Sequence, residues 1–115
     1  MVFTIASSLL LASGLPVHSQ EYRAWISVES EDSRLRIVGF CEAPEDGYVT
    51  YELKAVKTGG SGKSETSQSG RVYVTKGEAK GLSRLRLGVL PDDSYVIRLK
   101  VYKGKKLVAD DSVSR

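Results

Sequence analysis

The stretch Leu82–Val101, with the sequence LSRLRLGVLPDDSYVIRLKV, carries the clearest structural signal in this 115-residue chain. On each side of its Pro-Asp-Asp turn, apolar residues alternate with polar or charged residues. The alternating apolar positions are Leu85, Leu87 and Val89 before the turn and Tyr95, Ile97, Leu99 and Val101 after it. Because successive side chains of a β-strand point to opposite faces, this period of two predicts two strands, each with one buried face.

The same period of two extends through the chain after residue 20, and no helical periodicity interrupts it. We predict seven strands, at residues 22–29, 34–42, 48–57, 71–76, 82–89, 95–103 and 106–113. Ten of the thirteen residues of Thr58–Gly70 are Gly, Ser or Thr. This segment is therefore expected to be a flexible loop that crosses between two sheets.

Seven short strands in about a hundred residues are typical of an all-β, seven-stranded immunoglobulin-like β-sandwich. The segment Leu90–Tyr95 adds a more specific sign, because it resembles the tyrosine corner of such folds. In that motif the tyrosine ring packs in the core and its hydroxyl group bonds to nearby backbone. We therefore expect Tyr95 to be buried, and we interpret Asp92 and Asp93 as solvated turn residues.

Residues 1–19 have the composition of a signal peptide, and residues 20–115 form the expected single domain. The segment Val2–Leu15 is apolar and small, and a cut after Ser19 would leave Gln20 as the mature N-terminus. The stretch is too short for a comfortable membrane span, so we expect none in the mature protein. No Lys or Arg precedes Arg23, which departs from the usual signal pattern and keeps a buried first strand or an apolar anchor as alternatives.

The residue types most often used in catalysis and metal binding are scarce. The chain has one His, which lies in the predicted signal peptide, one Cys and no Asn. A mature chain without His has no His general base and no His-bearing metal site. The lone Cys41 excludes an intramolecular disulfide and a Cys-cluster zinc site, and alternation places it on the core side. We predict a protein that is not an enzyme and uses no cofactor and no metal.

Charge is distributed unevenly along the chain, whose net charge is +3. Residues 21–52 carry a net charge of −5, whereas residues 54–106 carry +9. Such asymmetry predicts a basic face that steers an acidic partner, although a solvated face that only keeps the protein soluble is an equally good interpretation.

Alternation also identifies side chains that should point away from the core, provided that the first, second and fifth strands share a sheet. The candidate binding residues are Trp25, Arg36, Phe40, Arg84 and Arg86 on this face, and Arg98 and Lys100 as a second basic patch on the other sheet. A mixture of arginine and aromatic residues suits a protein partner. It also suits single-stranded nucleic acid, whose bases stack on aromatic rings, but we expect no nucleic acid partner.

Four segments occur in the order and spacing of a known family: Ser67–Arg71 (SQSGR), Lys76–Glu78 (KGE), Leu82–Leu85 (LSRL) and Leu90–Tyr95 (LPDDSY). On these residues, and over about Tyr22–Val113, the chain resembles the curli amyloid-inhibitor family, the CsgC/CsgH-type periplasmic chaperones, and in particular its CsgH branch. The resemblance implies a secreted immunoglobulin-like sandwich that blocks premature polymerisation of amyloid-forming curli subunits in the periplasm, without enzymatic activity.

On this basis we expect a monomeric periplasmic inhibitor that binds the subunit or its early nuclei transiently, with long-range charge accelerating the encounter. Pairing of an edge strand with the subunit is the rival mode of binding. An alternative function is a structural or adhesive module of an envelope or extracellular assembly. A thiol oxidoreductase would need a second Cys. Some family members have Cys-x-Cys near the third strand, where this chain has Tyr48–Thr50.

Overall fold

The computed structural model describes residues 21–115, so the signal peptide predicted at residues 1–19 lies outside the described residues. Seven strands joined by short turns make up the described chain: β1 (Arg23–Glu31), β2 (Arg34–Glu42), β3 (Gly47–Gly59), β4 (Gly62–Val74), β5 (Lys80–Gly88), β6 (Ser94–Lys103) and β7 (Lys106–Ser114). This content confirms the predicted all-β class. Within residues 21–115, no helix is long and apolar enough to cross a membrane.

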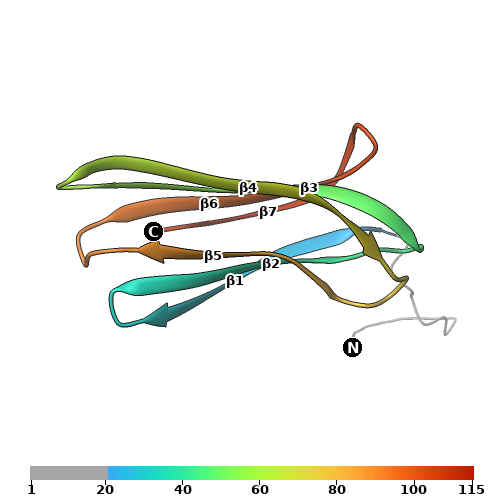
Figure 1. The fold of residues 1–115 in the computed structure, drawn as a ribbon, viewed down its shortest axis with the longest axis horizontal. Coiled ribbons are helices and arrows are strands. Elements are labelled where there is room, and N and C mark those ends of the chain that lie inside the picture. The colour runs from blue at the N-terminus through green and yellow to red at the C-terminus, as the bar shows by residue number, and fades with distance from the viewer. Residues whose placement is uncertain (1–20) are drawn as a thin grey trace, which may run out of the picture.

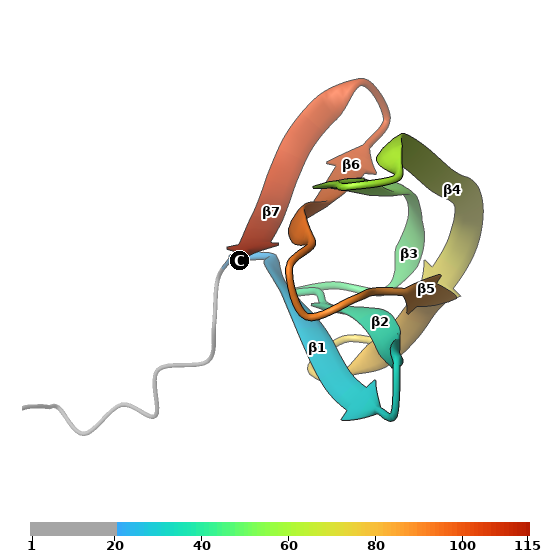
Figure 2. The ribbon, with the colours of Figure 1, turned by 90° about the vertical axis from the view of Figure 1, so that its left-hand side faces the viewer.

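The strands form two antiparallel sheets that pack face to face (Figure 1). One sheet has three strands in the order β1-β2-β5, and the other has four strands in the order β4-β3-β6-β7. Seen from the end, β1 lies near β7 on one side of the sandwich and β4 lies near β5 on the other side (Figure 2). The prediction of a seven-stranded immunoglobulin-like sandwich is therefore confirmed.

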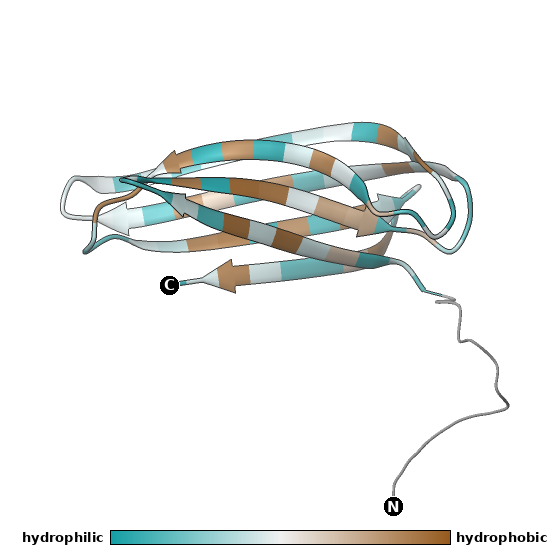
Figure 3. Ribbon diagram, turned by 90° about the horizontal axis from the view of Figure 1, so that it is seen from below, coloured by the Kyte–Doolittle hydropathy of each residue, from teal (hydrophilic) through white to brown (hydrophobic). Residues whose placement is uncertain are grey.

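The core is built from side chains that alternate along the strands as the sequence predicts. Hydrophobic and hydrophilic bands follow one another along the strands in Figure 3. The largest fully buried side chains are those of Ile37, Cys41, Val49, Leu53, Val74, Ile97, Leu99 and Val101. Removing such apolar surface from water is the main contribution that stabilises a fold of this size.

The predicted flexible loop at Thr58–Gly70 is wrong, because this segment belongs to two strands of 13 residues each. β3 and β4 pair without a register shift over their full length, and only Gly60 and Ser61 form the turn between them. The physical reason is that β4 is an edge strand with most of its side chains in water, so small polar residues are compatible with it. The crossing that was expected in this loop takes place after Val74, where the chain passes from β4 to β5.

Side-chain hydrogen bonds connect the sheets along their open sides. On the β1/β7 side, the backbone amide of Ile26 donates to Asp111 Oδ2 at 2.9 Å. On the β4/β5 side, the hydroxyl group of the buried Ser83 donates to Gln68 Oε1. A register shift leaves Leu82 without a partner in β2, so that Leu82 and Ser83 are both buried. Gln68 and Ser83 belong to the SQSGR and LSRL segments, which therefore meet across the sandwich.

Gly70 is required by the tyrosine opposite it in β3. A Cβ atom at this position would lie 2.8 Å from the hydroxyl oxygen of Tyr51 and 3.1 Å from its Cζ atom. We expect Gly70→Ala to lower the free energy of unfolding by about 1–3 kcal/mol, because the ring must leave its packed position. Chemical denaturation measures this change, and Gly60→Ala is the matched control, since nothing lies within 4 Å of a Cβ atom there. Equal effects of the two substitutions would contradict the packing role of Gly70.

The start of β6 has only part of the predicted tyrosine corner. Tyr95 is buried, as predicted. Its hydroxyl group, however, makes no hydrogen bond to any of the described residues, which differs from the motif. Instead, Tyr95 and Arg115 exchange two backbone hydrogen bonds of 2.9 and 3.1 Å, and the Arg115 guanidinium carbon lies 5.1 Å from the centre of the tyrosine ring. The C-terminal residue thus completes this corner of the fold.

Asp93 in the same turn is buried rather than solvated, so the prediction for this residue is wrong. Its carboxylate accepts a hydrogen bond of 2.8 Å from the backbone amide of Leu90 and lies 3.8 Å from Lys57 Nζ. An aspartate can satisfy a backbone amide of its own turn in this way, which explains how its charge tolerates burial. Asp92 remains exposed, as predicted.

Candidate protein-binding face

The outer face of the three-stranded sheet carries an aromatic pair. Trp25 of β1 lies opposite Phe40 of β2, and their rings stack with centroids 5.5 Å apart and an interplanar angle of 14°. The guanidinium carbon of Arg23 lies 5.6 Å from the centre of the Trp25 ring. Both aromatic side chains are partly exposed, so the pair offers a flat apolar surface as well as stabilising the sheet.

Arg84 and Arg86 of β5 lie on the same outer face, as the alternation predicts. Arg84 is opposite Val38 of β2, and Arg86 is opposite Arg36. Arg84 and Arg86 are exposed, and neither has an ion-pair partner among residues 21–115. Their charges are therefore available to a partner. We refer to Trp25, Val38, Phe40, Arg84 and Arg86 as the arginine–aromatic face.

Arg36 shares this face but contributes little free charge to it. Its Nη2 atom donates to Glu29 Oε1 and lies 3.7 Å from Glu31 Oε2. The hydrogen bond to Glu29, followed by the charge of Glu31, raises the pKa of Arg36. The positive charge of the face is consequently concentrated on Arg84 and Arg86.

A shallow hollow lies between the aromatic pair and the arginines. Its volume is about 250 Å³, and it is lined by Ser27, Glu29, Arg36, Val38, Phe40 and Arg84. A lining that combines apolar side chains with charged ones is typical of a surface that contacts another protein. The structure therefore brings all five residues predicted for this face into one sheet, which depends on β1, β2 and β5 being neighbours.

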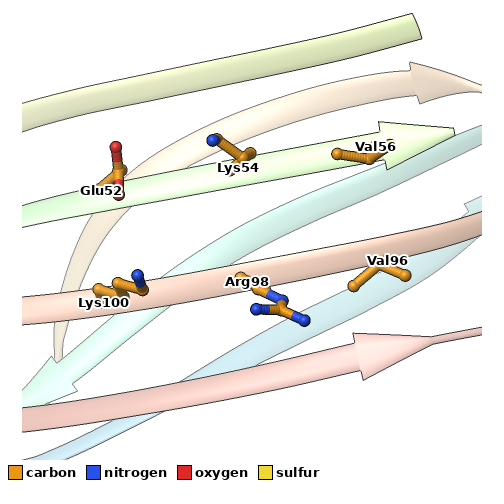
Figure 4. A pocket seen from close by; sticks show the side chains of 6 residues that line it. All are labelled: Glu52, Lys54, Val56, Val96, Arg98 and Lys100. Carbon is orange, nitrogen blue, oxygen red and sulfur yellow. The ribbon is translucent and has the colours of Figure 1, made fainter. Parts of the chain in front are cut away.

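Arg98 and Lys100 lie on β6, on the outer face of the four-stranded sheet (Figure 4). They line an open hollow of about 340 Å³ with Glu52, Lys54, Val56 and Val96. Lys100 is opposite Glu52 in the register, and Arg98 is opposite Lys54, which lies 3.3 Å from Glu65. This patch mixes both signs of charge, and it is on the opposite side of the sandwich from the arginine–aromatic face.

A second exposed aromatic cluster, which was not predicted from the sequence, lies on β3 and β4. Tyr48 and Tyr73 are each 50% exposed, and their rings meet edge to face with centroids 5.2 Å apart. The guanidinium carbon of Arg71 lies 4.0 Å from the centre of the Tyr48 ring. The cluster follows from the register of the β3–β4 hairpin, which places Tyr48 opposite Tyr73. The loop predicted at Thr58–Gly70 leaves this register undefined, so the pairing of the two tyrosines could not be predicted.

Cys41 lies on β2 and faces the core, as predicted, with no exposed surface. Burial, and then the charge of Glu42, raise the pKa of its thiol from 9.0 to about 11. The thiol is therefore protonated at neutral pH, whereas the nucleophilic form of cysteine is the thiolate. No group of His, Cys, Asp and Glu that could hold a metal ion is present among residues 21–115.

We expect Cys41 to be dispensable. Cys41→Ala should lower the free energy of unfolding by about 1 kcal/mol, because it removes one buried sulfur atom. In the native protein at pH 8 the thiol should resist alkylation. Mass spectrometry measures the fraction of the protein that is alkylated. As the pH rises, the thiol of the unfolded chain loses its proton at a lower pH than the thiol of the folded chain. The contribution of the protonated Cys41 to the free energy of unfolding is therefore present below pH 9 and falls as the pH rises toward about 11. Rapid alkylation of the folded protein would contradict this assignment.

This chain is similar to known proteins in its fold. No protein-family model matches the sequence, and no curated protein matches it. The curli protein CsgC of E. coli has a similar structure, with a TM-score of 0.70 and 18% identity, over 80% of this chain and 97% of that chain. The solution structure of CsgH from R. palustris is also similar, with a TM-score of 0.63 and 20% identity, over 77% and 89% of the two chains. The resemblance seen in the sequence therefore extends to the fold.

Proposed function

We propose that this chain is a CsgC/CsgH-type protein of curli biogenesis that acts in the periplasm as a chaperone-like inhibitor of curli subunit polymerisation. The fold supports the proposal, because a curli protein of E. coli has the same sandwich over nearly its whole length. The placement of the sequence segments supports it as well, since SQSGR and LSRL contact each other through Gln68 and Ser83.

The arginine–aromatic face is the proposed binding surface for the subunit, and its two unpaired arginines are the observation that carries this choice. Unpaired charges on a rigid sheet accelerate the encounter with an acidic partner, and they act at long range. The adjacent Trp25–Phe40 stack supplies apolar contact once the partner has arrived. Binding of this kind is transient and needs no catalytic group, so we propose that the protein is not an enzyme.

An inhibitor that acts on early nuclei delays polymerisation at low molar ratios, because nuclei are rare. An amyloid nucleus grows through exposed strand edges and dry side-chain contacts, and a bound sandwich would block that growth. Dye-monitored polymerisation of a purified curli subunit tests the proposal. The expected result is a longer lag time at a substoichiometric amount of this protein. An unchanged lag time at equal concentrations would overturn the function, and a stable stoichiometric complex would indicate a structural module instead.

A further inference from the structure

The outer edge of β4 is unusual among the four edges of the sandwich. β4 has 13 residues and pairs with β3 without a register shift, while no other strand of residues 21–115 pairs with its outer side. Its central segment, Thr66–Gly70, contains no charged residue and no proline. A long, regular edge without charge at its centre is open to pairing with a further strand.

The other three edges carry features that hinder such pairing. The amide of Ile26 on β1 is bonded to the carboxylate of Asp111. β5 is interrupted by the register shift at Leu82 and carries the exposed charges of Arg84 and Arg86. β7 has a register shift as well, where its pairing with β6 changes beside Val101. Bulges, charges and covered amides are the usual means of protecting an edge, and β4 has none of them at its centre.

The backbone groups of β4 that face this edge follow from the hairpin register. Gly59 and Gly62 flank a two-residue turn, so they form a hydrogen-bonded pair, and bonded pairs recur at every second residue. The odd-numbered residues of β4 therefore direct their backbone groups away from β3. β1 also ends in a two-residue turn, so the same rule directs its even-numbered backbone groups away from β2. The amide of Ile26 accordingly points outward and donates its hydrogen bond to Asp111.

We propose that β4 pairs antiparallel with β4 of a second copy of this chain, about a two-fold axis at Gln68. This register places each odd-numbered residue opposite another odd-numbered residue, as edge pairing requires. The cross-strand pairs of the odd-numbered residues, each present twice, are Lys63 with Tyr73, Glu65 with Arg71, and Ser67 with Ser69. Each of these three pairs is favourable, as a cation over an aromatic ring, an ion pair and two hydroxyl groups respectively.

The neighbouring registers are less favourable, so the charges select this one. A shift of the axis to Ser67 places Lys63 opposite Arg71, which brings like charges together. A shift of the axis to Ser69 leaves Glu65 opposite Tyr73 and forms no ion pair. The exposed side chains of Glu65 and Arg71 remain accessible, although Glu65 contacts Lys54 within its own chain.

The dimer departs from the monomer expected from the sequence, and it goes beyond the proposed function. It uses the edge of the four-stranded sheet and leaves the arginine–aromatic face, on the other sheet, free. An isologous interface of this type closes after two copies. The two sheets of four strands would then join into one continuous sheet.

Sedimentation of the purified protein over a range of concentrations tests the proposal. We expect reversible dimerisation with a Kd below roughly 1 mM. Glu65→Arg and Arg71→Glu should each weaken it by roughly tenfold or more, because each variant places two pairs of like charges across the interface. An equimolar mixture of the two variants should recover the dimer, since both pairs are then attractive. Arg86→Glu, which also reverses an exposed charge, should have no effect.

A thiol pair provides an independent measure of the register. Ser67→Cys and Ser69→Cys, mixed under oxidising conditions, should form a disulfide between chains, because opposite residues in this ladder are about 5.5 Å apart. Either variant alone should cross-link much less. A wild-type protein that stays monomeric near ~1 mM, or a mixture of charge variants no more dimeric than either variant alone, would overturn the proposal. Charge variants that alter subunit inhibition but not sedimentation would assign the edge to the subunit and overturn it equally.

Discussion

Replacing both Arg84 and Arg86 with Glu is expected to raise the concentration needed for half-maximal inhibition of curli subunit polymerisation by roughly tenfold or more. The two arginines are the unpaired cations of the arginine–aromatic face, and their reversal turns a long-range attraction into a repulsion. Steering charges of this kind change association rates by about ten- to a thousandfold. The free energy of unfolding should change by less than about 1 kcal/mol, because exposed charges contribute little to folding.

The matched control is Arg98→Glu with Lys100→Glu, which changes the same net charge on the opposite face. A larger loss of inhibition for the first pair would assign the encounter to the three-stranded sheet. Added salt should weaken inhibition by the wild-type protein, since charges more than about 8 Å apart are screened at physiological ionic strength. Equal lag times for wild type and the folded Arg84/Arg86 variant at low and high salt would exclude steering by this face and favour pairing of an edge strand.

The sequence predicted the sandwich because its buried residues alternate without interruption. Ile97 and Leu99 are buried and Arg98 between them is exposed, as a period of two requires. The same alternation placed Trp25 and Phe40 on one face, and the observed stack between them follows from the register of β1 and β2. Local pattern was sufficient wherever one face of a strand is buried.

Prediction from the sequence failed where burial does not determine the alternation of apolar and polar residues. β4 is an edge strand whose side chains are mostly exposed, so its Ser, Thr and Gly residues indicated a loop. Only pairing along the whole of β3 makes this segment a strand, and such pairing is a non-local property. The ion pairs of Arg36 were missed for a related reason: they depend on which residues of β1 lie beside it.

Composition also gave no sign that one acid of the Asp92-Asp93 pair is buried. The two residues have identical side chains, and only the path of the turn directs one into the protein. The Asp93 side chain is 3% exposed, and its Oδ1 atom occupies the space that a Cβ atom at Gly59 would need. The absence of a side chain at Gly59 therefore allows the carboxylate to lie between the end of β3 and the start of β6.

Asp93→Ala is expected to lower the free energy of unfolding by about 2–4 kcal/mol. The substitution removes the acceptor of the Leu90 amide and the carboxylate near Lys57, and losing one partner of a buried polar contact costs more than the contact contributes. Lys57 keeps its hydrogen bond of 2.9 Å to the carbonyl oxygen of Gly88, which limits the loss. Chemical denaturation followed by circular dichroism measures the change.

Asp92→Ala is the matched control, because it removes the same side chain from the exposed neighbouring position. It should change the free energy of unfolding by less than about 0.5 kcal/mol. Asp93→Asn separates the two contributions at the buried site, since the amide oxygen can still accept from Leu90 while the charge near Lys57 is lost. An intermediate stability for Asp93→Asn would assign part of the effect to the hydrogen bond. Equal stabilities of the Asp92→Ala and Asp93→Ala variants would show that the turn does not depend on its buried carboxylate.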